Sequence, residues 1–125
     1  MKSRGFTLIE LLIVVVIIGI LAAFAIPKFA NTKQKAYVAQ MKSDIKNLTT
    51  AEEAFFYDSA YYTTSLVALN NFQASTGVTL TINEATPMGW SASTVHSQTA
   101  RQCALFQGSA APVAPATVEG RITCS

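Results

Sequence analysis

The sequence has few of the residues on which most enzymes and metal sites depend. Its 125 residues include one histidine, His96, and two cysteines. A histidine-based metal triad is excluded, and a serine or cysteine nucleophile would need that single histidine as its base. The only acids beyond Asp58 are Glu84 and Glu119, and no glycine-rich phosphate loop is present. We therefore expect no catalytic site, no metal and no cofactor.

The chain also lacks a strong net charge. Its formal net charge is +2 at pH 7, and removing Lys2 and Arg4 leaves seven basic and seven acidic side chains. General nucleic-acid binding requires a basic surface. DNA binding through a local basic cluster is conceivable, but no segment of the sequence supports it.

Charge is absent altogether between Leu11 and Ile26. Counted from Phe6, the apolar stretch is about 32 Å long as a helix at ~1.5 Å per residue, and a hydrocarbon core is ~30 Å thick. The stretch therefore predicts a membrane-spanning helix. Its one carboxylate, Glu10, would cost ~2.5–3.5 kcal/mol deep in a membrane helix, so we expect Glu10 to have a partner.

Two simple interpretations of this stretch are open. A secretory signal peptide could be cut at the small residues around Ala23–Ala25, although the apolar run exceeds the ~7–15 residues of a usual signal core. A plain single-span anchor would leave Glu10 unexplained. Both interpretations are disfavoured on these grounds.

The run Gly5-Phe6-Thr7-Leu8-Ile9-Glu10 resembles the processing site of type IV pilins and of the related pseudopilins of type II secretion. The resemblance is close through Lys28. It implies that a prepilin peptidase removes residues 1–5 by cutting between Gly5 and Phe6, and then methylates the amine of Phe6. In that family Gly19 and Pro27 correspond to positions that weaken the helix.

The same resemblance gives Glu10 a role in assembly. After cleavage the amine of Phe6 is a cation, methylation preserves its charge, and Glu10 is one helical turn away. Glu10 can then pair with its own terminus or with that of a neighbouring chain, which removes the penalty of either charge alone. The family is thought to use the pairing between chains, which sets the register of an incoming subunit.

The two cysteines, Cys103 and Cys124, have 20 residues between them and no CxxC pattern, so zinc is not expected. Beyond a membrane span, in an oxidising compartment, they predict a disulfide that contributes roughly 3 kcal/mol. Two free buried thiols are the alternative. Pilins commonly have a C-terminal disulfide loop of this sort.

Helical spacing continues beyond Pro27 to about Asp58. Proline inside a helix costs ~3 kcal/mol and glycine ~1 kcal/mol, so Gly19 and Pro27 predict weak points in one long helix. An apolar stripe at three- and four-residue steps forms one face of the second half. Its members are Tyr37, Val38, Met41, Ile45, Leu48, Ala51 and Phe55.

The remaining residues predict a small sheet. We expect an irregular connection over residues 59–75, with a short helical turn near 65–71. Apolar residues then alternate with polar ones, which favours strands. The predicted strands are 78–82, 90–95, 101–107 and 118–124. The expected fold is α+β: a long N-terminal helix packed on a four-stranded antiparallel sheet, which resembles the pilin fold.

Four segments therefore follow one another: a leader (1–5), a membrane or filament-core helix half (6–27), an amphipathic helix half (28–58) and a globular head (59–125). The resemblance implies a precursor in the inner membrane and then an extracellular helical filament of identical subunits. A prepilin peptidase, an assembly ATPase and an inner-membrane platform protein are the implied partners.

Two alternatives to a type IV pilin are retained. Major pseudopilins typically have a C-terminal calcium site, for which the two acids beyond Asp58 are a poor supply of ligands, so a pilin is favoured. A membrane-anchored or secreted monomeric binding module that uses residues 28–125 is the alternative from a different class.

Overall fold

The computed structural model describes residues 1–70 and 72–125. They form two compact units, Met1–Lys33 and Gln34–Ser125. One helix, α1 (Leu8–Ser59), passes through both units. The strands β1 (Val78–Thr86), β2 (Gly89–His96), β3 (Thr99–Gly108) and β4 (Thr123–Cys124) all belong to the second unit.

Helix α1 agrees closely with the predicted helix of residues 6–58. Pro27 lies inside the helix but does not end it. The helix is continuous from Leu8 to Ser59. The helix ends where Ala60 adopts a φ of 62°, and its N–H still donates to the carbonyl of Phe56 at 2.8 Å. A left-handed residue just after the last turn is a common way to end a helix.

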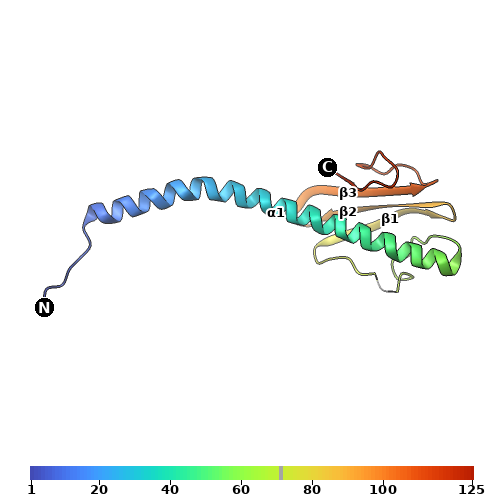
Figure 1. Cartoon of the computed structure of the whole chain (residues 1–125), viewed down its shortest axis with the longest axis horizontal. Helices are drawn as coiled ribbons and strands as arrows, with labels where there is room; N and C mark the ends of the chain where they lie inside the picture. The colour runs from blue at the N-terminus through green and yellow to red at the C-terminus, as the bar shows by residue number, and fades with distance from the viewer. Residues whose placement is uncertain (71) are drawn as a thin grey trace. The chain divides into compact units, whose positions relative to one another are not determined.

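The sheet has the strand order β1-β2-β3-β4, and every neighbouring pair is antiparallel. Figure 1 shows β1, β2 and β3 side by side in this order. The predicted alternation is confirmed in β1, where Val78, Leu80 and Ile82 are buried and the residues between them are exposed. The register of β1 against β2 shifts between Ile82 and Glu84, so the alternation ends there.

The predicted fourth strand is wrong over most of its length. Only Thr123 and Cys124 pair with β3, whereas residues 118–120 form a bend and a turn and residues 121–122 have no assigned secondary structure. Gly120 has a φ of +71°, and its N–H donates to the carbonyl of Phe106 at 2.9 Å. A positive φ reverses the chain direction and interrupts an extended strand, so the alternation of Val118, Gly120 and Ile122 was misleading.

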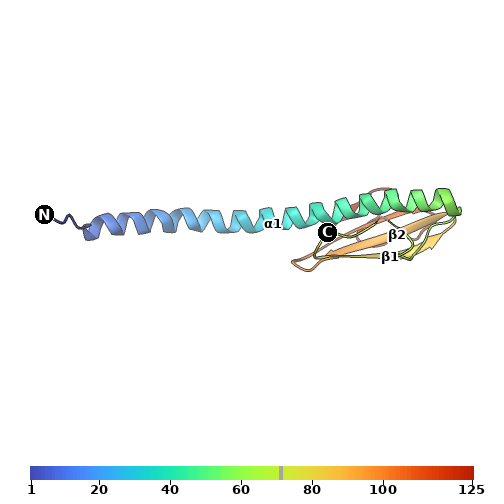
Figure 2. The ribbon, with the colours of Figure 1, turned by 90° about the horizontal axis from the view of Figure 1, so that it is seen from below.

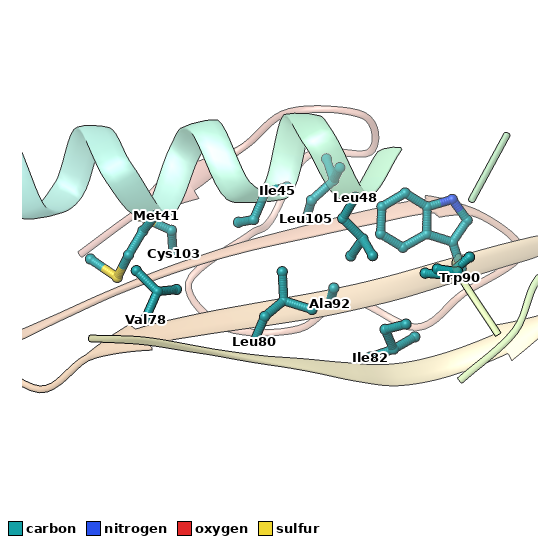
Figure 3. Close-up of a cluster of buried hydrophobic side chains, with 11 residues drawn as sticks. Met41, Ile45, Leu48, Val78, Leu80, Ile82, Trp90, Ala92, Cys103 and Leu105 are labelled. Atoms are coloured by element: carbon teal, nitrogen blue, oxygen red, sulfur yellow. The ribbon is translucent and has the colours of Figure 1, made fainter. Parts of the chain in front are cut away.

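The core of the second unit lies between α1 and one face of the sheet (Figure 2). Met41, Ile45 and Leu48 on the helix are fully buried, and Trp90 on β2 is fully buried opposite them. Figure 3 shows the helix side chains pointing into the layer of side chains from the strands. The predicted apolar stripe is thus the face of α1 that covers the sheet.

Between helix and sheet, residues 60–70 and 72–77 have no assigned helix or strand, in agreement with the irregular connection predicted for 59–75. Turn-like hydrogen bonds run from the N–H of Ala68 to the carbonyl of Ser65 and from the N–H of Leu69 to that of Leu66. The helical turn was predicted for 65–71, and Asn71 lies outside the described residues. What is described between 65 and 70 is a series of turns and bends without an assigned helix.

The predicted disulfide is confirmed. Cys103 on β3 and Cys124 on β4 are direct partners in the register of the two strands, and their sulfur atoms are bonded. The alternative of two free thiols is excluded. The bond holds the C-terminal segment on the sheet where β4 has only two residues with which to pair.

Candidate functional site

The apolar side chains of the first unit are exposed on every side of the helix. The large ones from Leu8 to Phe29 are between 50% and 83% exposed. The most apolar window of α1 has a mean hydropathy of 3.1 and is long enough to cross a membrane, by length and composition. A helix that is apolar all around is normally buried in a large core or a membrane, so this surface requires a cover.

The predicted cleavage point, between Gly5 and Phe6, lies outside this helix. Residues 1–7 have no assigned secondary structure, and all of them are exposed. A Cβ atom added to Gly5 would meet nothing within 4 Å. The bond is therefore open to an incoming protease, and larger side chains at residue 5 would not disturb the fold.

Glu10 has a local partner, Thr7. One carboxylate oxygen, Oε2, accepts the N–H of Thr7 at 2.8 Å and its hydroxyl at 2.7 Å. In return, Oγ1 of Thr7 accepts the N–H of Glu10 at 3.3 Å. This reciprocal arrangement is a capping box, which satisfies backbone donors at the start of a helix.

The capping box was missed in the sequence, although its signal was present. Thr7-Leu8-Ile9-Glu10 has the Thr-x-x-Glu pattern of a capping box directly before an apolar run. The structure thus gives Glu10 a hydrogen-bonding partner in the uncut chain. A pairing of Glu10 with the amine of Phe6 requires cleavage and stays a prediction.

The two predicted weak points lie inside α1. A Cβ atom at Gly19 would meet nothing within 4 Å, so no close contact in the described residues requires glycine there. Pro27 has no N–H to donate to the carbonyl four residues earlier, that of Ala23. Their role in weakening the helix remains a prediction.

Two buried acids in the second unit were not predicted as important. Asp44 is 2% exposed and accepts both the N–H of Ser75 at 2.9 Å and its hydroxyl at 2.8 Å. Glu52 is fully buried and accepts the N–H of Thr63 through Oε2 at 3.1 Å. Both acids tie the connection between α1 and β1 to the helix.

Glu52 is less well satisfied than Asp44. Its second oxygen, Oε1, has no hydrogen-bonding partner among the described residues. Burial raises the pKa of Glu52, the bond from Thr63 opposes that rise, and the neighbouring charge of Glu53 adds to it. Burial also raises the pKa of Tyr62, whose hydroxyl donates to Glu53 at 3.0 Å.

No group of three or more histidine, cysteine, aspartate or glutamate side chains within residues 1–70 and 72–125 is placed to hold a metal ion. His96 lies at the end of β2, where it is stacked on Tyr37 with ring centroids 4.3 Å apart. Its Nδ1 accepts the N–H of Gln98 at 3.0 Å. The one histidine therefore has packing and hydrogen-bonding partners of its own.

Comparison with known proteins identifies the N-terminal motif. The family described as the prokaryotic N-terminal methylation motif matches residues 1–26. The chain is 49% identical over 61 residues to the type IV major pilin protein PilA of Myxococcus xanthus, an alignment that covers 49% of this chain and 28% of that protein. It is 50% identical over 60 residues to the type IV major fimbrial protein FimA of Dichelobacter nodosus, covering 46% and 38%.

A second class of relative matches about equally well. The type II secretion system core protein G of Escherichia coli is 41% identical over 64 residues, covering 51% of this chain and 44% of that protein. The chain thus spans less than half the length of each of these curated relatives. The predicted resemblance to pilins and pseudopilins is confirmed for the N-terminal part of the chain.

Proposed function

We propose that the chain is the structural subunit of a type IV pilus. Its precursor is held in the inner membrane by the apolar half of α1, is cut between Gly5 and Phe6, and is methylated at Phe6. The mature chain, from residue 6 onward, then polymerises into a helical filament on the cell surface. The observation that carries this proposal is the exposed apolar helix of the first unit.

The energetics of that helix support polymerisation. Burying one large apolar side chain contributes about 1.5–3 kcal/mol, and every large side chain from Leu8 to Phe29 is at least half exposed. Lipid covers such a surface in the precursor. In a filament the same surface is covered by the helices of other subunits, so a subunit can leave the membrane without exposing it to water.

Glu10 changes partner in this scheme. Before cleavage, the hydrogen bonds from Thr7 lower the cost of its carboxylate within the membrane. After cleavage, the charged amine of Phe6 on a neighbouring subunit is a stronger partner, because an ion pair neutralises both charges. Cleavage thereby makes a chain competent to assemble, since an uncut chain has no amine at residue 6.

Three variants test this scheme. Glu10→Ala should leave processing largely intact and impair fibre formation. Glu10→Gln keeps an acceptor for the Thr7 N–H but removes the charge, so it should impair fibres as well if the ion pair matters. Gly5→Leu should block cleavage, because the backbone there has room for the side chain while the peptidase motif is lost. Normal fibre numbers in both Glu10 variants would refute the register role.

The primary experiment is N-terminal sequencing and intact mass measurement of protein sheared from the cell surface. A chain that begins with methylated Phe6 in this fraction is the expected result. A chain that begins at Ile26 would instead indicate a secretory signal peptide and a monomeric binding module. The proposed partners, which are the peptidase, the assembly ATPase and the platform protein, are tested by loss of surface fibres when each is deleted.

A pseudopilin of type II secretion is the second candidate, favoured by the similarity to core protein G. A major pseudopilin would bind calcium near its C-terminus. Addition of Ca²⁺ should then raise the unfolding temperature of the second unit, whereas a pilus subunit should show no shift. Loss of protein secretion, with surface fibres unchanged, would also favour the pseudopilin.

A further inference from the structure

Two faces of α1 have the same spacing and opposite character. The first face, which we call the ridge, consists of Ile26, Phe29 and Lys33, at steps of three and four residues. The second face, which we call the furrow, has the same steps and consists of Ala51, Ala54 and Asp58. Steps of three and four place each set on one side of a helix. The ridge has two large apolar side chains followed by a cation, and the furrow has two small apolar side chains followed by an anion.

The ridge is an exposed surface of the first unit. Ile26 is 69% exposed and Phe29 is 64% exposed. The ammonium of Lys33 lies 5.3 Å from the centre of the Phe29 ring, so the cation and the aromatic ring form one continuous surface.

The furrow lies on the second unit at the edge of the apolar stripe, where Ala51 is partly buried against the core and Ala54 and Asp58 are exposed. Ala51 and Ala54 line one cavity of about 200 Å³, which Asp58 also lines, and a second of about 380 Å³. Residues 68–70 form a wall of the first cavity, and Phe72 and Gln73 form a wall of the second. Small side chains with room beside them allow another helix to approach closely.

Asp58 lacks electrostatic support from its own helix. It is in the last turn of α1, where the partial charge of the helix dipole is negative, and no basic residue lies in that turn. The side chain is exposed. An external cation beside Asp58 would be favoured both by the carboxylate and by the helix end.

We infer that the ridge of one copy packs into the furrow of a second copy, with Lys33 paired to Asp58. The two helices run parallel, because only then do the charged ends of both triads meet while Ile26 and Phe29 lie against Ala51 and Ala54. In an antiparallel pair, Lys33 would lie against Ala51. The inference rests on the proposed function, in which the subunits of a filament all point the same way.

Zero-length cross-linking tests the contact directly. A carbodiimide activates the carboxylate of Asp58, and the Lys33 amine then displaces the activating group to form an amide. In sheared wild-type filaments we expect a covalent dimer on a denaturing gel, with a cross-linked peptide that joins Lys33 to Asp58. Lys33→Arg is the matched control: it keeps the charge and the filaments but should lose this dimer.

A charge exchange tests the energetic role. Lys33→Glu and Asp58→Lys should each reduce the amount of filament at least several-fold, and the double variant should recover most of it. Lys35→Glu makes the same charge change on another face of α1 and should have little effect. Because Asp58→Lys places a cation at the helix C-terminus, it should not impair folding.

The outcomes separate this inference from the proposed function. Wild-type filaments without the Lys33–Asp58 cross-link, or a double variant as defective as the singles, would overturn the inference and leave the pilus proposal intact. A cross-link from Asp58 to another lysine would overturn the register of ridge against furrow. Absence of any filament from the wild-type protein would overturn both.

Discussion

The two units of the chain use the same apolar residue types in opposite ways. In Met1–Lys33, Ile17 and Ile18 are 54% and 59% exposed, whereas in Gln34–Ser125 Ile45 on the same helix is fully buried. The second unit has a sheet to cover its apolar stripe, and the first unit has none among its own residues. One helix therefore contributes to a closed core in one unit and has an exposed apolar surface in the other.

This difference shows that hydrophobic content alone does not indicate where a core lies. The pattern does: in the second half of α1, apolar residues occupy one stripe and lysines the other faces, but in the first half they occupy all faces. A stripe can be satisfied within a monomer. A helix that is apolar on all sides requires lipid or several neighbouring helices.

The largest expected contrast comes from equivalent truncations in the two units. Leu48→Ala should lower the free energy of unfolding of the second unit by about 2–5 kcal/mol, since it opens a cavity in a closed core. Ile18→Ala should change it by less than about 0.5 kcal/mol. Denaturation of the full chain in detergent micelles, followed by the fluorescence of the buried Trp90, measures both. Equal effects would contradict the division into two units.

Removal of the disulfide should sharpen the same division. The double variant Cys103→Ala, Cys124→Ala should lower the free energy of unfolding of the second unit by about 3 kcal/mol. The helix content of the first unit in micelles, measured by circular dichroism, should not change. Wild-type protein with and without reductant is the control, and a loss below about 1 kcal/mol would show that β4 needs no covalent support.

The sequence predicted the elements that local patterns determine. The α1 stripe follows from the spacing of apolar residues along the helix, and the strand β1 follows from the alternation of apolar and polar residues. The disulfide follows from the presence of a single pair of cysteines. The acids Asp44 and Glu52 could not be assigned in this way, because their partners, Ser75 and Thr63, lie in an irregular connection. Both acids accept hydrogen bonds from backbone N–H groups. Because every residue except proline has such a group, residue type does not indicate which one will be the donor.

The strand predicted at residues 118–124 failed for a related reason. Alternation identifies a strand only if each residue is extended, and Gly120 is free to adopt the positive φ that breaks it. At the N-terminus, by contrast, a short sequence pattern does determine the local structure. The Thr7–Glu10 capping box is encoded by residues only three apart, so this part of the candidate site could have been predicted.

A smaller effect, confined to the second unit, is expected from the charge of Glu52. Because burial raises its pKa in the folded state, its contribution to stability is complete below the pKa of the unfolded chain and is lost as the pH rises through the folded pKa. The wild type should therefore lose stability relative to Glu52→Gln as the pH rises above the pKa of an unfolded glutamate, about 4.3.

Urea denaturation at several pH values measures this difference. Glu119 provides the control, because Glu119→Gln makes the same change of charge at an exposed site and keeps an acceptor for the N–H of Gly108. Its stability difference from the wild type should depend less on pH. A constant difference between the wild type and Glu52→Gln across these pH values would contradict the raised pKa.

The smallest effect should appear at the start of α1. Thr7→Ala removes the side-chain half of the capping box and should weaken the first helical turn by about 1 kcal/mol. Hydrogen exchange of the Glu10 amide in micelles should become several-fold faster, while Trp90 fluorescence stays unchanged. Thr32→Ala makes the same truncation further along α1, where the lost hydroxyl is bonded to the carbonyl of Lys28; it is the control and should leave that exchange unaltered.

The Cys103–Cys124 bond also limits how far a subunit can be stretched. The two cysteines are 21 residues apart, and a fully extended chain spans ~3.3–3.6 Å per residue. The bond therefore prevents about 70 Å of chain from being extended when the subunit is pulled. A force applied between α1 and Ser125 would therefore pass from β3 through the two sulfur atoms. The loop between the cysteines would carry no load.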